Sequence, residues 1–248
     1  MPRLKDCLPL AGAAVLSPLL LAQALHVRRV TPRLPEAAGP RRGEAGQGPL
    51  LRLLILGDSA AAGVGVAEQS EALSGQLLRL LTADFRVHWM LHAQSGFKTA
   101  DLLRNLGTLT PVPVDAVVTS LGVNDVTGAT RRQRWQQLQA ELIETLKQRF
   151  EARLILLSAV PPMHRFPALP QPLRQTLGWR ARRLNATLAE LAAAQDGVEL
   201  CQIPFPPNPV YMAEDGFHPG PRAYALWAEA LAIQIRAKFS PARPQAID

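Results

Sequence analysis

Cysteine and histidine are scarce in this chain of 248 residues, and their scarcity limits the chemistry open to it. The two cysteines, Cys7 and Cys201, form neither a disulfide framework nor the paired spacing of a metal site. Two-metal hydrolytic sites usually combine several histidines with bridging carboxylates, and this sequence has five histidines in total. We therefore expect no metal and no other cofactor, and a metal-dependent phosphoesterase is only a weak alternative.

Strong positive charge and nucleotide-binding motifs are also missing from the body of the chain. The formal net charge is +7, but residues 1–49 hold seven Lys or Arg against three Asp or Glu, which leaves +3 for the rest. That surplus is too small to indicate a nucleic-acid-binding surface. The stretch 57–65 has neither a Gly-Lys-Ser/Thr ending nor a Gly-x-Gly-x-x-Gly pattern, so it does not predict a phosphate-binding loop. We expect a small-molecule substrate and no nucleic-acid partner.

An apolar run from Leu8 to Leu25 leaves several fates open for residues 1–30, which we interpret as an apolar leader. The run is typical of a signal peptide with Ala22-Gln23-Ala24 as its cleavage site, and its length is marginal for a membrane anchor. Positive charges directly after it, beginning with Arg28, favour keeping that flank in the cytoplasm. A leader that lies on a membrane surface or folds against the body is a further alternative. Export, membrane association and a cytoplasmic location all stay open.

Composition changes along the rest of the chain and divides it into three parts. Residues 31–49 are rich in Pro, Gly, Ala and Arg without any periodicity, which predicts a flexible linker. Residues 50–240 carry the regular patterns of one folded domain. Residues 241–248 are expected to form a short tail.

Apolar runs and helical stripes alternate through the domain. Predicted strands cover residues 50–56, 85–91, 114–121, 154–160 and 198–203. Predicted helices cover residues 69–83, 99–106, 131–150, 173–195 and 220–238. Strands that alternate with helices form a parallel sheet with helices on both faces. We expect a three-layer α/β/α sandwich of the flavodoxin-like type, with a central parallel sheet of about five strands.

Short polar blocks lie at the ends of these predicted strands. Gly57-Asp58-Ser59 follows the first strand, Ser95-Gly96 follows the second, and Gly122-Val123-Asn124-Asp125 follows the third. A fourth block, Asp215-Gly216-Phe217-His218, precedes the last helix. In open α/β sheets, ligands bind beyond the carboxyl ends of the strands. We therefore expect the four blocks to meet in one site.

The four blocks resemble the motifs of the SGNH, or GDSL-type, hydrolase family, and the resemblance runs in order through residues 50–238. The four residues that name the family are matched by Ser59, Gly96, Asn124 and His218. Asp215 stands three residues before the histidine. The resemblance implies that Ser59 is the nucleophile, His218 the base and Asp215 the carboxylate that orients the base.

The resemblance also implies an oxyanion hole. Its donors would be the backbone N–H groups of Ser59 and Gly96 and the side-chain amide of Asn124. Such donors stabilise the negative charge that develops when a nucleophile attacks an ester carbonyl. Asp58 and Asp125 are expected to brace the loops by hydrogen bonds.

Serine chemistry of this kind needs no cofactor. A neutral imidazole can take the proton of a serine hydroxyl, and a carboxylate on its other nitrogen fixes the tautomer and stabilises the imidazolium. We expect a serine hydrolase that cleaves carboxylic esters: an esterase, a lipase or a thioesterase. The alternative is an acyltransferase or deacetylase that acts on a glycan or lipid hydroxyl with the same site.

Two proline-rich stretches, 161–172 and 204–209, flank the predicted site. Large apolar side chains lie in and next to them, namely Met163, Phe166, Leu169, Phe205, Tyr211 and Met212. Loops near strand ends often shape substrate pockets. These side chains are expected either to line an acyl or alcohol pocket or to pack the loops against the body.

Overall fold

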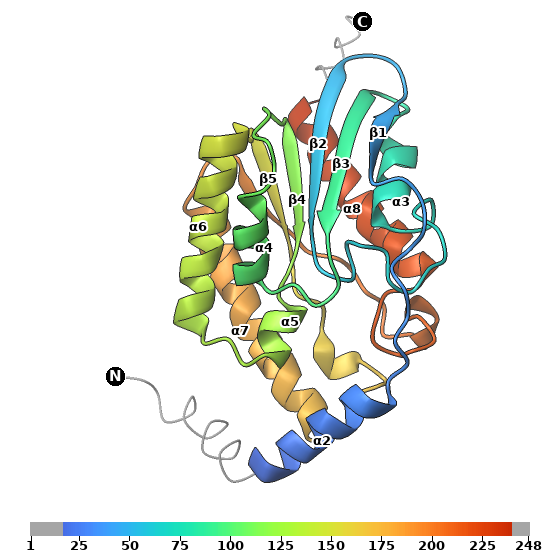
Figure 1. Cartoon of the computed structure of the whole chain (residues 1–248), viewed down its shortest axis with the longest axis vertical. Helices are drawn as coiled ribbons and strands as arrows, with labels where there is room; N and C mark the ends of the chain where they lie inside the picture. The colour runs from blue at the N-terminus through green and yellow to red at the C-terminus, as the bar shows by residue number, and fades with distance from the viewer. Residues whose placement is uncertain (1–16, 240–248) are drawn as a thin grey trace, which may run out of the picture.

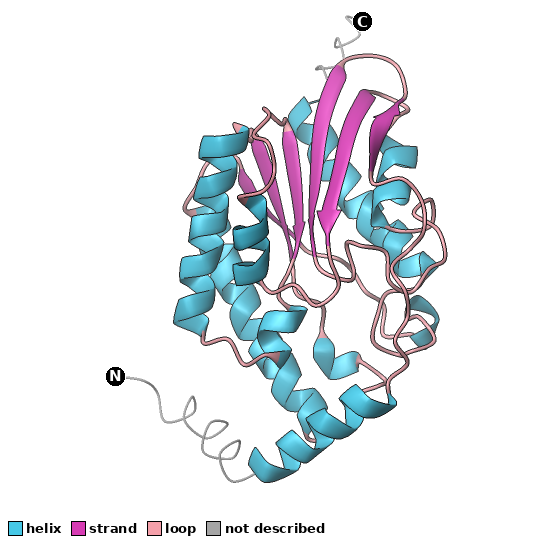
Figure 2. Cartoon of the chain, viewed as in Figure 1, coloured by secondary structure: helices cyan, strands magenta, loops and turns pink. Residues whose placement is uncertain are grey.

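A central sheet with helices on both faces forms the body of the protein in the computed structural model, which describes residues 17–239 (Figures 1 and 2). The sheet has six strands in the order β1-β3-β2-β4-β5-β6. Five of them run parallel, and β1 pairs antiparallel with β3 at one edge. The predicted three-layer α/β/α fold and its parallel sheet are confirmed. The strands are β1 (Arg42–Ala45), β2 (Leu50–Gly57), β3 (Arg86–Ala93), β4 (Ala116–Ser120), β5 (Leu154–Ser158) and β6 (Val198–Cys201).

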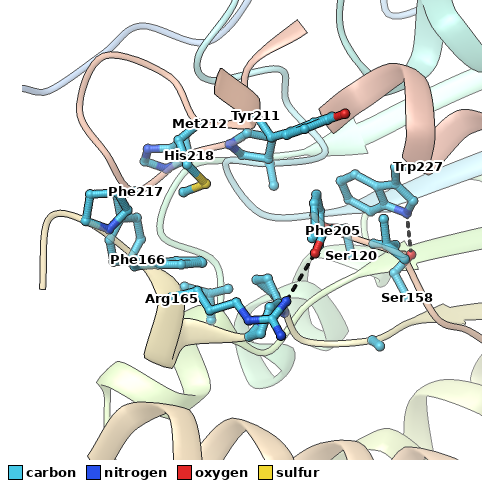
Figure 3. Close-up of a pocket in the computed structure, with 18 of the residues that line it drawn as sticks. Ser120, Ser158, Arg165, Phe166, Phe205, Tyr211, Met212, Phe217, His218 and Trp227 are labelled. Atoms are coloured by element: carbon cyan, nitrogen blue, oxygen red, sulfur yellow. Dashed lines mark hydrogen bonds between the residues drawn. The ribbon is translucent and has the colours of Figure 1, made fainter. Parts of the chain in front are cut away.

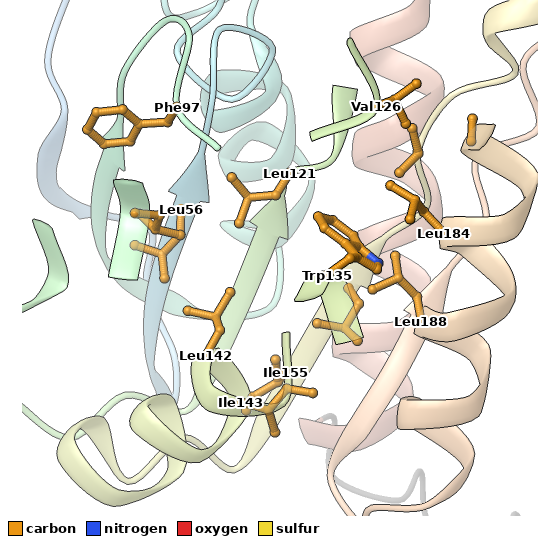
Figure 4. Packing of buried hydrophobic residues seen from close by; sticks show 14 of the residues in the cluster. Leu56, Phe97, Leu121, Val126, Trp135, Leu142, Ile143, Ile155, Leu184 and Leu188 are labelled. Atoms are coloured by element: carbon orange, nitrogen blue, oxygen red, sulfur yellow. The ribbon is translucent and has the colours of Figure 1, made fainter. Parts of the chain in front are cut away.

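The central strand β2 shows why both faces of the sheet need a cover. Its side chains alternate, so that Leu54 and Leu56 belong to one apolar cluster, and Leu53 and Ile55 belong to another. Helices α4, α6 and α7 close the first cluster, part of which Figure 4 shows, and α3 and α8 close the second. These helices are α3 (Leu73–Leu81), α4 (Thr99–Leu106), α6 (Arg132–Phe150), α7 (Leu173–Ala193) and α8 (Pro221–Phe239).

Helix α6 illustrates how the pattern of the sequence leads to packing. Trp135, Leu142 and Leu146 recur at helical spacing and are all buried against the sheet. Trp135 is the largest of the fully buried side chains and belongs to the same cluster as Ile155 of β5 (Figure 4). The helix ends where Glu151 takes the left-handed conformation, with φ of 49°, and the chain then turns into β5.

The segment 31–49 departs from its prediction, because part of it belongs to the fold. It contains β1, a sixth strand that the sequence analysis missed. It also docks on the loop after β2, where the Gln69 N–H donates to the Ala38 carbonyl at 2.7 Å. A four-residue edge strand of sequence Arg-Gly-Glu-Ala has no apolar alternation, so nothing in its pattern separates it from a linker. The description of 31–49 as a flexible linker was therefore wrong for this part.

A second short element, α5 (Val123–Thr127), was also missed. It begins directly after the third predicted strand and contains Asn124 and Asp125. Five residues make little more than one turn of helix, which is too short to produce a visible apolar period.

The amino-terminal leader lies partly outside the described residues, which begin at 17. Its second half forms α2 (Ser17–Val30), which buries Val27. The Gln23 amide joins α2 to the start of α7, donating to the Gln171 carbonyl at 2.7 Å and accepting from the Leu173 N–H at 3.1 Å. Among the described helices, none combines the length and apolar character needed to cross a membrane. The predicted tail, 241–248, lies outside the described residues.

Candidate active site

Ser59 lies in the turn that follows β2 at the carboxyl edge of the sheet. The turn passes very close to β4, because a Cβ atom on Gly57 would lie 2.4 Å from the Ser120 carbonyl oxygen. The same carbonyl accepts the Asp58 N–H at 3.1 Å, which ties the start of the turn to β4. This close approach requires glycine at position 57. Ser59, two residues later, is half-buried in the turn.

Ser59, His218 and Asp215 form one hydrogen-bonded line. The His218 Nε2 atom is 3.0 Å from Ser59 Oγ, and its Nδ1 atom is 2.6 Å from Asp215 Oδ2. The other carboxylate oxygen, Asp215 Oδ1, accepts the backbone N–H groups of Phe217 and His218, each at 2.9 Å. The fold thus brings together all three residues predicted to act in catalysis, although 156 positions of sequence separate Ser59 from Asp215.

Asp215 is held as a carboxylate in this arrangement. Its side chain is buried, and burial acts to raise its pKa. The hydrogen bonds from the His218 ring and from the N–H groups of His218 and Phe217 outweigh burial and hold the pKa of Asp215 below its ordinary value. An ionised Asp215 accepts a hydrogen bond from the Nδ1–H group of His218, so Nε2 is left as the acceptor that faces Ser59.

The three predicted oxyanion donors follow three neighbouring strands, β3, β2 and β4. Within residues 17–239, neither the Ser59 N–H nor the Gly96 N–H donates a hydrogen bond to another part of the protein. Gly96 has a φ of 87°, and no atom lies within 4 Å of the position that a Cβ would take. The Asn124 amide donates to the Phe97 carbonyl at 3.0 Å and lies 3.4 Å from Asp58 Oδ2. The N–H groups of Ser59 and Gly96, which donate no hydrogen bond within the described part of the chain, and the Asn124 amide thus lie on three adjacent loops.

Asp58 lies almost fully buried beside the nucleophile. Its Oδ1 atom accepts the Ala60 N–H at 3.1 Å. Burial raises the pKa of Asp58 from an ordinary value near 3.8 to about 7, because the charged form loses its hydration. The nearby charge of Asp125 adds to this rise, and the Ala60 hydrogen bond and His218 oppose it.

Asp125 connects three segments of the site. One oxygen accepts both the Thr99 N–H at 3.1 Å and the Thr99 hydroxyl at 3.0 Å, and the other accepts the Thr130 hydroxyl at 3.2 Å. Gln139 of α6 donates in turn to the Thr99 hydroxyl at 3.1 Å. Burial raises the pKa of Asp125 despite these hydrogen bonds. These contacts join the loop that carries Asn124 to the start of α4.

An ion pair that sequence reasoning missed supports the loop that carries Gly96. Glu36 Oε1 accepts the Ser95 N–H at 2.6 Å, and Glu36 Oε2 pairs with Arg41 at 2.5 Å. Arg41 also donates to the Ala93 carbonyl at 2.8 Å. Both charged residues belong to the segment 31–49. An acid and a base five residues apart in a Pro/Gly-rich stretch form no recognisable motif, so the sequence contained no usable signal for this contact.

An apolar cavity of about 490 Å³ opens beside Ser59 and His218 (Figure 3). Four of the six apolar residues proposed for a pocket line it: Phe166, Phe205, Tyr211 and Met212. The other two, Met163 and Leu169, pack into the core beneath the loops instead. Four of the six side chains therefore line a pocket, and the other two pack the loops against the body, so each expectation holds for part of the group.

Metal ligands do not cluster in the described part of the chain. Across residues 17–239, no group of three or more His, Cys, Asp or Glu side chains is placed to hold a metal ion. Cys201, the last residue of β6, is buried, and burial raises the pKa of its thiol to about 12. Cys7 lies outside the described residues.

Known proteins with related sequences and folds are esterases and lipolytic enzymes. A curated Mycobacterium tuberculosis protein named a GDSL-like esterase is 29% identical over 242 residues, covering 88% of this chain and 76% of that protein. The crystal structure of a lipolytic G-D-S-L family member from Veillonella parvula matches with a TM-score of 0.57, at 15% identity, over 76% of this chain and 99% of that one. A family 3 carbohydrate esterase of Clostridium thermocellum matches with a TM-score of 0.58, at 18% identity, over 76% of this chain and 98% of that one.

Structural matches at such low identity establish the fold alone, and the family follows from the sequence. The model of the GDSL-like lipase/acylhydrolase family matches residues 55–226, which is more than half of the chain. The matched region begins within β2 and ends within α8, so it contains strands β3 to β6 and all four polar blocks. The chain therefore belongs to the GDSL-like lipase/acylhydrolase family and is a carboxylic ester hydrolase.

Proposed function

We propose that the protein hydrolyses carboxylic esters through an acyl-enzyme on Ser59, with His218 as general base and Asp215 as the carboxylate that orients it. The observation that carries the proposal is the continuous line from Asp215 Oδ2 to His218 Nδ1 at 2.6 Å and from His218 Nε2 to Ser59 Oγ at 3.0 Å. Both distances lie within hydrogen-bond reach, which proton transfer requires.

In the first half of the reaction, Nε2 of His218 removes the Ser59 proton as Oγ attacks the ester carbonyl carbon. The carbonyl π bond opens, and the oxygen takes the negative charge. The N–H groups of Ser59 and Gly96, which have no other acceptor among the described residues, stabilise that charge together with the Asn124 amide. The imidazolium then gives its proton to the alkoxide that leaves, which releases the alcohol and keeps the acyl group on Ser59.

In the second half, water takes the place of the alcohol. His218 accepts a proton from the water as its oxygen attacks the acyl carbonyl. Collapse of the second tetrahedral intermediate breaks the bond to Ser59 Oγ, and His218 returns the proton to that oxygen. The products are a carboxylic acid and the original enzyme. Asp215 stays ionised throughout and stabilises the imidazolium.

The apolar cavity favours esters with an apolar acyl or alcohol group. Phe166, Phe205 and Phe217 line it, and burial of an apolar chain against them removes its surface from water. This feature is compatible with esterase, lipase and thioesterase substrates. The carbohydrate esterases among the structural neighbours share the fold at low identity, and their substrates do not transfer to this chain.

Replacement of the nucleophile is the direct test. We expect Ser59→Ala and His218→Ala each to lower kcat for a p-nitrophenyl ester by about 10⁴-fold or more, as in other serine triads. A fluorophosphonate probe should label the wild type and not Ser59→Ala. Near-normal turnover by Ser59→Ala would refute the mechanism.

The alternative acceptor is tested in the same assay. An acyltransferase uses the same acyl-enzyme but passes the acyl group to a glycan or lipid hydroxyl. Added glycerol or a sugar should leave the free acid as the main product if water is the natural acceptor. Labelling of Ser59 without release of free acid, together with acylation of the added hydroxyl compound, would favour the acyltransferase.

A further inference from the structure

The cavity beside Ser59 is apolar, yet two arginines line it. Arg165 belongs to the 3-10 helix η1 (Met163–Arg165), and Arg174 lies in the first turn of α7. The lining also contains Asp58 and His218, which lie at Ser59, and the phenol of Tyr211. The arginines have no part in the mechanism proposed for Ser59.

Neither arginine has a carboxylate partner within the described residues. Arg165 donates one hydrogen bond to the Phe205 carbonyl at 3.2 Å, which Figure 3 shows as a dashed line. Arg174 is half-buried, and its Nε atom is shielded from solvent without any hydrogen-bond partner.

The exposed Arg165 keeps its contact with water, whereas the shielded Nε–H of Arg174 is unfavourable without an acceptor. A donor that is shielded from water and makes no hydrogen bond loses its hydration without compensation. An anion would supply the missing acceptors, because carboxylate and phosphate oxygens match the planar donors of arginine. The positive charge and the hydrogen-bond donors of the two arginines therefore both favour an anionic ligand in this part of the cavity.

We propose that Arg165 and Arg174 bind an anionic group of the substrate, a carboxylate or a phosphate, which lies apart from the ester that is cleaved. This inference rests on the proposed function, because the same cavity holds Ser59 and His218. The preferred substrate is then an anionic amphiphile. Its apolar body lies against Phe166, Phe205 and Phe217, its ester faces Ser59, and its anion meets the two arginines.

The anion can sit on the acyl part or on the alcohol part of the ester, and paired substrates separate the two cases. The acyl arm compares mono-p-nitrophenyl esters of dicarboxylic acids, from succinic to sebacic acid, with p-nitrophenyl esters of monocarboxylic acids of equal length. The alcohol arm compares acetyl esters of ω-hydroxy acids with acetyl esters of simple alcohols, followed by acid release at constant pH.

Three variants complete the experiment: Arg165→Gln, Arg174→Gln and the double variant. The readout is the ratio of kcat/KM for the anionic and the neutral ester within each protein, so a general loss of activity cancels. We expect the wild type to favour the anionic member by about tenfold or more at its best chain length, through a lower KM. The double variant should bring the ratio close to one. Arg134→Gln on α6, an exposed arginine outside the cavity lining, removes the same charge and should keep the ratio.

A binding measurement separates failure of this inference from failure of the proposed function. Calorimetric titration of the Ser59→Ala protein with octanoate and with hexyl phosphate should give binding about tenfold tighter than with 1-octanol. The double change at Arg165 and Arg174 should abolish that difference. Tight anion binding without turnover of any ester by the wild type would leave the inference standing and overturn the proposed hydrolysis. Equal turnover of both ester classes, or a ratio that the double variant does not change, would overturn the inference.

Discussion

Two regions meet at the candidate active site and are held in place by different forces. One, the reactive edge, comprises the loops after β2, β3 and β4 that carry Ser59, Gly96 and Asn124. The other, the pocket wall, comprises residues 161–172 and 204–212 and forms much of the cavity.

The reactive edge depends on directed hydrogen bonds from buried polar groups. Asp125 accepts three of them, and Glu36 fixes the Ser95 N–H next to Gly96. The pocket wall is rich in proline, which has no N–H to donate, and apolar contacts hold it in place. Phe166 of the wall, for example, packs edge to face against Phe217, the neighbour of His218, with ring centroids 5.2 Å apart. Directed bonds require particular residue types, whereas apolar contacts tolerate many, so changes in the two regions should have different consequences.

Apart from replacement of Ser59 or His218, the largest effect is expected at the reactive edge, from Asn124→Ala. Its amide is one of the three proposed oxyanion donors, and loss of one such donor commonly costs about 10²–10³ in kcat. Steady-state kinetics with a p-nitrophenyl ester measure this loss. Labelling by a fluorophosphonate controls for an intact Ser59. A loss of less than about fivefold would exclude Asn124 from the oxyanion hole.

A second effect concerns how the free energy of unfolding of the protein depends on pH through Asp58 of the reactive edge. The folded-state pKa of Asp58 is about 7, above its ordinary value near 3.8. Between these values the folded protein keeps a proton that the unfolded chain has lost, so the free energy of unfolding falls as the pH rises. Asp58→Asn removes this dependence. When the pH rises from 5 to 8, the free energy of unfolding of the variant should increase by on the order of 3 kcal/mol relative to that of the wild type.

Urea denaturation at pH 5 and pH 8 measures that gain. Groups that titrate in both proteins cancel in the difference between them. Asp84→Asn, which removes an exposed carboxylate paired with Arg236, controls for the loss of one negative charge. An equal difference between Asp58→Asn and the wild type at both pH values would mean that Asp58 is already ionised in the folded protein at pH 5.

The contrast between the two regions also explains how much of the fold and of the candidate site could be predicted from the sequence. The apolar run of β2 and the stripe of α6 predicted the central layers, because burial imposes a period on the sequence. Ser59 was found in a short polar block at a strand end, and His218 in a block before the last helix that matches the same family motifs. The support by Glu36 and Arg41 was missed, since their contacts join segments more than 50 residues apart. Which apolar loop residues line the cavity, Phe166 or Met163, depends on three-dimensional packing that no local pattern encodes.

A third, smaller effect should follow from removal of that missed support. Glu36→Ala frees the Ser95 N–H and leaves Arg41 without its partner. The loop that carries Gly96 then loses a restraint, and we expect kcat to fall about tenfold with little change in KM, because misplaced donors act mainly on the transition state. Glu36→Gln keeps an acceptor for Ser95 and should recover most of the activity. An unchanged kcat in Glu36→Ala would show that the loop holds its shape without the ion pair.

The smallest effect is expected at the pocket wall, from Phe205→Ala. Phe205 is half-buried on the cavity, and loss of its ring removes apolar contact with one side of a bound chain. We expect kcat/KM for octanoyl esters to fall about three- to tenfold relative to acetyl esters, the equivalent of ~1 kcal/mol of lost apolar burial. Leu169→Val provides the matched control, because Leu169 belongs to the same loops but packs into the core. It should lower stability and leave the octanoyl-to-acetyl ratio unchanged. If both variants changed that ratio equally, the wall would act through loop packing rather than through contact with the substrate, and the contrast with the reactive edge would no longer hold.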